Sequence, residues 1–196
     1  MPTATRRMTV EEFLKIPDDG VERWLIEGEV YEFDQDPESV ELGMRIRNET
    51  HGFLVGRFSY FLNAWRDATK PPGGKVVCGE AGVRFSSKTP TLVGVDIAYI
   101  PPQVVAAKKG RSTVTVGVPL LIVEVLSPND TVKSVSKKVK TYLGAGVKHV
   151  WVVNPESETV MVHRPNHKPV SVNSDGFLTA EPDMPGLKIE LAQVFE

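Results

Sequence analysis

Pro119-Leu120-Leu121-Ile122-Val123-Glu124-Val125-Leu126 is the strongest strand pattern in this chain of 196 residues. A nearly continuous apolar run of this length is typical of a strand that is covered on both faces of a sheet. Turn residues follow at 127–130, a helix pattern runs over 131–145 until glycines end it, and a second apolar run covers 147–153. Strand, helix and strand in this order predict a βαβ crossover.

The rest of the chain alternates helix and strand patterns around this unit. A short helix is predicted to begin at the capping box of Thr9 and Glu12, and a long one lies within residues 39–68, which hold no proline. The other predicted strands are short runs between turn residues, at 21–27, 29–33, 75–78, 81–85, 92–100 and 159–163. Residues 101–118 are predicted as a loop, and the end of the chain as a peripheral hairpin and a closing helix near 191–195.

This order favours an α/β (α+β-like) fold with a mixed central β-sheet flanked by helices. The length predicts a single domain over residues 1–196. We assign 1–38 as an N-terminal helix and hairpin extension, and 156–196 as a C-terminal strand and helix extension.

Composition narrows the function classes. With 23 Lys plus Arg and 25 Asp plus Glu, the net charge of −2 excludes an arginine-rich nucleic-acid coat but allows a local basic face. No apolar run approaches the roughly 18 residues that span a bilayer, and no apolar signal core follows the N-terminus. We therefore expect a cytoplasmic protein that does not enter a membrane. The single cysteine, Cys78, excludes an intrachain disulfide, and we expect its side chain to be buried in a strand.

Two carboxylates stand alone in strands that otherwise have core composition. Asp96 lies within the run 92–100, and Glu124 lies within the stretch quoted above. An unpaired buried carboxylate is costly, so each needs a cation, a proton or a metal ion. Ion pairs with Lys or Arg, or exposed strand ends, would satisfy this need without chemistry. Paired acids on neighbouring strands would instead form an oxygen-ligand site suited to Mg²⁺ or Mn²⁺.

The helix that follows Glu124 offers a third group. At ~100° per residue its apolar side chains fall on one arc, while most of its lysines fall on the opposite face. Lys138 lies at the edge of this arc, about 40° from Tyr142, and is the lysine best placed to reach the sheet. It is either an ordinary boundary lysine or a partner of the two acids. Around a divalent metal, such a trio binds a phosphodiester and stabilises its developing charge.

Five segments together resemble a known family in their order and spacing. They are Trp24-Leu25-Ile26-Glu27-Gly28-Glu29-Val30, Gly94-Val95-Asp96-Ile97-Ala98-Tyr99, the stretch from Pro119 to Pro128, Lys138 with Tyr142, and Ala145-Gly146-Val147-Lys148-His149-Val150-Trp151-Val152-Val153-Asn154-Pro155. The chain resembles the Uma-two-type restriction endonuclease family, within the PD-(D/E)XK nuclease-like superfamily. The resemblance implies a restriction-endonuclease-like fold and a divalent-metal-dependent endonuclease that hydrolyses DNA.

The resemblance also implies roles for individual residues. Asp96 occupies the position of the first acid and Glu124 that of the second, and both would ligate Mg²⁺ (or Mn²⁺) with the backbone carbonyl of Val125. Leu126 stands where the superfamily carries its usual lysine, whereas in the resembling family this lysine comes from the next helix, where Lys138 lies. The chain departs from the family pattern at four positions: Trp24 in place of glutamate, Glu27 in place of aspartate, Val95 in place of proline and Ser134 in place of an acid.

Other residues are candidates for supporting roles. His51 lies on the apolar arc of the long helix and is either a core histidine or a group near the metal. Glu29 either approaches the site from the hairpin or is a solvated strand acid. Phosphate contacts are predicted for a loop and for the helix face, at Lys108, Lys109, Arg111 and Lys137. His149, His163 and His167 lack ligand spacing and are predicted to be structural or surface residues.

Two alternatives to a DNA-cleaving enzyme remain open. One is a catalytically inactive module that keeps the nuclease fold and binds nucleic acid or protein. The other is a structural ion-pair network in which Lys138 neutralises Asp96 and Glu124 without a metal. A homodimer is compatible with the sequence, because nucleases that cut both strands often act as pairs.

Overall fold

A nine-stranded mixed sheet dominates the part of the chain that the computed structural model describes, which is residues 7–17, 21, 23–32, 48–69, 73–85, 89–107, 112–128 and 130–196. The strand order is β2-β1-β4-β6-β7-β8-β9, with β3 paired to β4 and to β5. The strands of this sheet are β1 (Arg23–Ile26), β2 (Glu29–Glu32), β3 (Lys75–Arg84), β4 (Leu92–Ile100), β5 (Thr115–Val116), β6 (Leu121–Val125), β7 (His149–Asn154), β8 (Thr159–His163) and β9 (Val170–Asn173). A separate hairpin consists of β10 (Phe177–Ala180) and β11 (Met184–Glu190).

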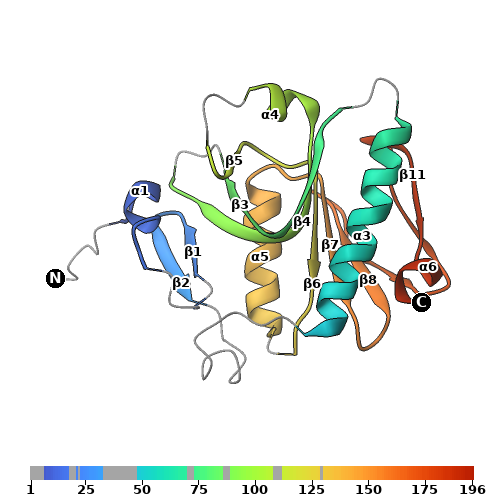
Figure 1. Cartoon of the computed structure of the whole chain (residues 1–196). Helices are drawn as coiled ribbons and strands as arrows, with labels where there is room; N and C mark the ends of the chain where they lie inside the picture. The colour runs from blue at the N-terminus through green and yellow to red at the C-terminus, as the bar shows by residue number, and fades with distance from the viewer. Residues whose placement is uncertain are drawn as a thin grey trace.

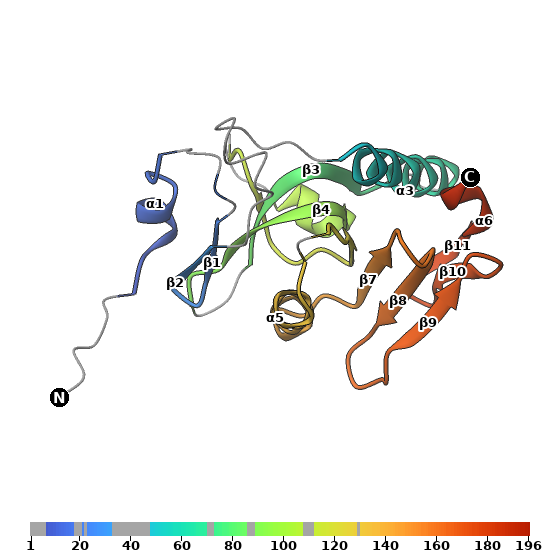
Figure 2. The ribbon, with the colours of Figure 1, turned by 90° about the horizontal axis from the view of Figure 1, so that it is seen from below.

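Helices lie on both faces of this sheet (Figures 1 and 2). The described helices are α1 (Val10–Phe13), α3 (Glu49–Ala68), α4 (Pro102–Ala106), α5 (Val132–Gly144) and α6 (Ala192–Phe195). The apolar side of α3 packs on one face through Leu54, Phe58 and Leu62, whereas α5 packs on the other through Val139 and Tyr142. The mixed sheet flanked by helices confirms the predicted fold class. None of the helices in the described ranges is long and apolar enough to cross a membrane.

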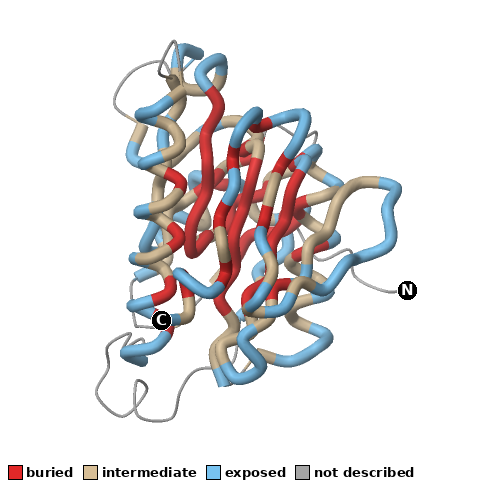
Figure 3. The backbone as a smooth tube through the Cα atoms, turned by 90° about the vertical axis from the view of Figure 1, so that its right-hand side faces the viewer, coloured by how far each residue is buried: buried red, intermediate tan, exposed pale blue. Residues whose placement is uncertain are grey.

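The central βαβ unit forms as its sequence predicts. Strands β6 and β7 pair in parallel, with Glu124 opposite Val152, and α5 connects them. Thr131 caps this helix, because its hydroxyl oxygen accepts a hydrogen bond from the N–H of Ser134. This cap defines the residue at which the preceding turn ends. All five residues of β6 are buried, in agreement with its continuous apolar pattern. Buried segments run side by side through the middle of the molecule (Figure 3).

Strands from both ends of the chain join this sheet. The predicted hairpin forms as β1 and β2, and Glu27 and Gly28 at its turn have φ values of 53° and 83°. Two consecutive positive φ angles suit a tight two-residue hairpin turn, and glycine meets this requirement without strain. Strand β1 pairs with β4 through Leu25 and Leu92, and at the other end β8 pairs with β7.

Three details differ from the sequence expectation. The runs at 75–78 and 81–85 form one strand, β3, which is interrupted by a bulge between Cys78 and Ala81. Within the predicted loop 101–118, Pro102 begins the short helix α4, because proline is favoured in the first helical turn. The expectation for Cys78 is wrong, because its side chain is exposed. The bulge begins directly after Cys78 and breaks the regular packing of β3 there. The next residue, Gly79, has no side chain that could cover Cys78.

Candidate active site

The bulge in β3 lies opposite Asp96. Cys78 pairs with Ile97 and Ala81 with Val95, so two residues of β3 face one residue of β4. On β4, Val95 packs in the core cluster of α5, whereas Ile97 packs in the core cluster of α3. Residues two apart on a strand normally point to the same face of the sheet, but Val95 and Ile97 point to opposite faces. This change at Asp96 is consistent with the ability of bulges to redirect side chains.

Asp96 and Glu124 occupy corresponding positions on neighbouring strands. Strands β4 and β6 are antiparallel, with Ile97 opposite Val123, and the next step of this register is Asp96 with Glu124. Both side chains are buried, with 7% and 6% of their surface exposed. The sheet topology thus brings together the two acids that the sequence singles out.

Asp96 is held by one group from α3 and one from β6. Its Oδ1 lies 3.2 Å from Nε2 of His51, and its Oδ2 accepts a hydrogen bond of 2.8 Å from the N–H of Val125. His51 lies in the first turn of α3, where its own N–H donates to Oδ1 of Asn48, the N-cap residue. His51 is therefore a buried histidine in direct contact with the first acid.

Glu124 is held by two side chains of α5. The hydroxyl of Tyr142 donates to Oε1 over 2.7 Å, and Nζ of Lys138 lies 3.2 Å from Oε2. These residues are four apart, so they lie on the same side of the helix. Lys138 also lies over the ring of Trp24, with 4.9 Å between Nζ and the ring centroid. The side chain at the edge of the helical arc thus reaches the second acid.

Burial and charge act differently on the two acids. Burial by itself would raise the pKa of Asp96, but contact with His51, the N–H of Val125 and the charge of Lys138 together hold this pKa below its ordinary value. Burial raises the pKa of Glu124 to about 7, and the negative charge of Asp96 acts in the same direction, against Lys138 and Tyr142. Glu124 can therefore hold a proton near neutral pH while Asp96 stays ionised.

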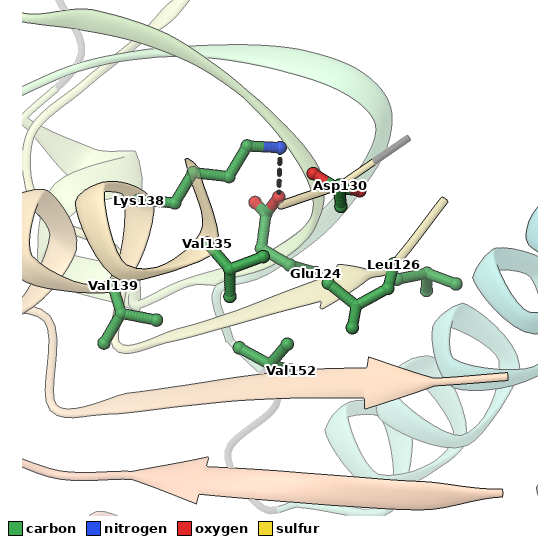
Figure 4. A pocket seen from close by; sticks show the side chains of 8 residues that line it. Glu124, Leu126, Asp130, Val135, Lys138, Val139 and Val152 are labelled. Carbon is green, nitrogen blue, oxygen red and sulfur yellow. Dashed lines mark hydrogen bonds and ion pairs between the residues drawn. The ribbon is translucent and has the colours of Figure 1, made fainter. Parts of the chain in front are cut away.

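A small cavity opens beside Glu124 (Figure 4). Its volume is about 220 Å³ including the open mouth, and it is lined by Glu124, Val125, Leu126, Asp130, Val135, Lys138, Val139 and Val152. Asp130 is a lining residue that the sequence analysis did not identify. Its Oδ2 accepts hydrogen bonds from the N–H and the hydroxyl of Ser127. The position of this acid in the turn directly after β6 is the signal that could have revealed it.

The remaining candidates fall into three groups. Glu29 is exposed and accepts a hydrogen bond from the hydroxyl of Tyr31, and the structure records no contact between it and either acid. Lys137 directly precedes Lys138 in α5, and its Nζ donates a hydrogen bond of 3.3 Å to the same Tyr31 hydroxyl. Lys108, Lys109 and Arg111 lie outside the described residues. Ser134, where the family pattern carries an acid, completes the cap of α5 with Thr131.

The donor set suits a hard divalent cation. Among the described residues, no three His, Cys, Asp or Glu side chains form a group that could hold a metal ion. The two carboxylates nevertheless provide oxygen ligands, and the backbone carbonyl of Val125 could supply another. Each carboxylate oxygen has two lone pairs, so it can accept its recorded hydrogen bond and still face a cation. Asp96 and Glu124 with Val125 therefore fit Mg²⁺ or Mn²⁺.

Comparison with known proteins identifies a family and a similar fold. The family model Uma2, described as "Putative restriction endonuclease", matches residues 10–192. A solved structure described as a putative nuclease belonging to DUF820 from Anabaena variabilis ATCC 29413 superposes with a TM-score of 0.75 at 18% sequence identity. The alignment covers 96% of this chain and 97% of that chain, which supports a shared fold. None of the curated proteins compared with the sequence matches it.

Proposed function

The chain belongs to the Uma2 family of putative restriction endonucleases, and we propose that it is a divalent-metal-dependent endonuclease that hydrolyses DNA phosphodiester bonds. One observation carries the proposal: two buried carboxylates, Asp96 and Glu124, occupy corresponding positions on adjacent strands, with a lysine ammonium 3.2 Å from the second. Acidic pairs with a neighbouring lysine suit phosphoryl chemistry, in which negative charge must be neutralised as it develops.

Each residue has a distinct part in the proposed reaction. Asp96 and Glu124, with the carbonyl of Val125, would hold Mg²⁺ or Mn²⁺, which supplies Lewis-acid activation of a phosphate oxygen and of a water molecule. Lys138 orients the attacking water or stabilises the charge that develops on the phosphate. His51 acts through Asp96, because its contact with Oδ1 sets the direction of the carboxylate.

DNA is the proposed partner, since a nuclease must hold a polyanion. Lys137 directly precedes Lys138 in α5, and we assign it a contact with a phosphate next to the reacting one. Lys108, Lys109 and Arg111 remain candidates for further phosphate contacts. We also propose that two copies act together when both strands are cut, which sedimentation with and without DNA would test.

DNA cleavage by purified protein in Mg²⁺ or Mn²⁺ tests the proposal. Glu124→Gln keeps the size of the side chain and its hydrogen bond with Tyr142 but removes the charge, so cleavage should fall at least about 100-fold. Glu156→Gln, which changes an exposed acid on the turn after β7, is the matched control and should cleave like the wild type. Equal cleavage by both variants would contradict the proposal.

A second candidate is a module that keeps the fold and has lost the chemistry. The observation that favours it is that all four carboxylate oxygens of Asp96 and Glu124 already have partners within the protein. In such a module Lys138 balances the charge of Glu124, His51 contacts Asp96, and no metal is needed. Calorimetry with Mn²⁺ separates the two candidates, because only a metal site binds the ion and loses it in Glu124→Gln.

A further inference from the structure

Two consecutive lysines of α5 lie over aromatic rings of the β1–β2 hairpin. Nζ of Lys138 is 4.9 Å from the ring centroid of Trp24, and Nζ of Lys137 is 4.5 Å from that of Tyr31. Trp24 and Tyr31 are directly opposite in the hairpin register, so their side chains share one face. The hairpin therefore presents a pair of aromatic rings to the lysines beside the active site.

The contact with Trp24 belongs to a closed ring of four side chains. Trp24 packs against Tyr142 with 5.7 Å between ring centroids, Tyr142 donates to Glu124, and Glu124 pairs with Lys138. The ammonium of Lys138 lies over the Trp24 ring and completes the cycle. Trp24 is only 1% exposed, so its ring is held firmly by the core.

We propose that Trp24 is a positioning residue that holds the ammonium of Lys138 at Glu124. The β1–β2 hairpin then contributes to the active site through Trp24. This inference rests on the proposed nuclease function for its catalytic consequence, but the placement of Lys138 can be tested independently.

A ring face is well suited to this task. It attracts the positive charge through its quadrupole and accepts no strong hydrogen bond from the ammonium. The ammonium of Lys138 therefore keeps its hydrogen bond with Glu124 while it lies over the ring. A carboxylate in place of Trp24 would instead compete for those protons and add a further negative charge beside Glu124.

Nuclear magnetic resonance tests the placement directly. A lysine over an indole face shows an upfield ring-current shift of its Hε protons, and the Lys138 signal is identified by its loss in Lys138→Met. We expect this shift in the wild type, a smaller one in Trp24→Phe and none in Trp24→Leu. Trp151→Leu is the matched control, because Trp151 is another fully buried tryptophan and packs in the core cluster of α3. An unchanged Lys138 shift in Trp24→Leu would overturn the inference.

Cleavage kinetics test the catalytic consequence. We expect kcat to fall about tenfold or more in Trp24→Leu and to be largely restored in Trp24→Phe, which keeps an aromatic face. In the Lys138→Met background, Trp24→Leu should cause no further loss, because the two residues act as one unit. A loss in Trp24→Leu that equals the loss in Trp151→Leu would indicate general destabilisation and would contradict the positioning role.

Fluorinated tryptophan provides a test that does not depend on the folding of Trp24→Leu. Fluorine weakens the negative face of the ring and nearly keeps its shape, so both the Lys138 position and kcat should change with the number of fluorines. The same labelling in Trp24→Phe, which retains two tryptophans, should have no effect. If the wild type cleaves no DNA, the proposed function fails, and the ring-current shift alone then decides whether Trp24 holds Lys138.

Discussion

The backbone N–H of Val125 donates a hydrogen bond of 2.8 Å to Oδ2 of Asp96. Val125 directly follows Glu124, so one peptide group on β6 ties the first acid to the second. The bond also orients Asp96, because its other oxygen faces His51 from α3. The relative position of the two acids is therefore built into strand pairing, and it does not depend on a flexible loop.

Asp96→Asn should abolish metal binding with little change in fold. Asparagine keeps an oxygen that can accept the N–H of Val125, but it lacks the charge that a divalent cation requires. We expect the heat of Mn²⁺ binding in calorimetry to disappear, while urea unfolding remains cooperative. Asp67→Asn, which alters an exposed acid on α3, should bind Mn²⁺ like the wild type. Retention of wild-type affinity in Asp96→Asn would remove Asp96 from the metal site.

Lys138→Met distinguishes a catalytic lysine from a structural ion pair. Because Glu124 already has a pKa of about 7, it can take up a proton when the ammonium is lost, so we expect a stability loss of about 1 kcal/mol. Cleavage should fall at least about 100-fold in the same variant. If the ion pair were mainly structural, its removal would cost about 3–5 kcal/mol of unfolding free energy. Urea denaturation and cleavage assays on one preparation measure both quantities.

Local patterns predicted most of the fold. Strand β4 forms over 92–100 as expected, because Pro101 follows an unbroken strand pattern and ends it, and α5 forms over Val132–Gly144, within one residue of the range predicted for it. The bulge of β3 was not predictable, because a Gly-Glu pair between two strand patterns has the composition of a turn. Its two positive φ values, 77° at Gly79 and 58° at Glu80, are set by pairing with β4.

The main residues of the candidate site could also be predicted from the sequence. The sequence alone identifies Asp96 and Glu124, because each is an isolated acid in an apolar strand. It also identifies Lys138, because this lysine lies at the edge of the apolar arc of its helix. The contacts of Trp24 with Lys138 and of His51 with Asp96 join segments that are far apart in the sequence. Such contacts depend on how the hairpin and α3 pack on the sheet, and no local pattern encodes them.

Glu124 should make the metal-free protein less stable as the pH rises. Its pKa is about 7 in the folded protein and 4.5 as its ordinary value, so the folded state binds more protons between these pH values. The stabilisation from protonated Glu124 is thus fully present below about pH 4.5 and is lost as the pH passes 7, with a total on the order of 3 kcal/mol.

Urea unfolding at pH 5 and pH 8 measures this effect, and Glu124→Gln is the reference because it cannot titrate. We expect the wild type to lose more unfolding free energy than the variant over this interval. Mn²⁺ should oppose the loss at pH 8, since a cation stabilises the ionised pair. Parallel pH dependence in the two proteins would contradict the assignment of Glu124 as the titrating group.

His149 lies at the end of β6 and β7 that is opposite to the candidate active site, and it should make the stability of the protein sensitive to acid. It is 2% exposed, and its Nε2 lies 3.0 Å from Oδ2 of Asp183, which precedes β11. Burial lowers the pKa of His149, and the contact with Asp183 opposes this only in part. The unfolded chain therefore binds the proton more readily than the folded one. The stability that neutral His149 contributes is present above the pKa of the unfolded chain, near 6.5. It is lost as the pH falls through the lowered pKa of the folded protein.

His149→Gln should remove part of this acid sensitivity. We expect the wild type to lose more unfolding free energy than the variant between pH 7 and pH 5, because only the wild type must keep an imidazole neutral in the core. His167→Gln is the control, since His167 is exposed and lies in the turn after β8. If His149→Gln and His167→Gln show the same pH dependence as the wild type, acid destabilisation arises elsewhere in the molecule.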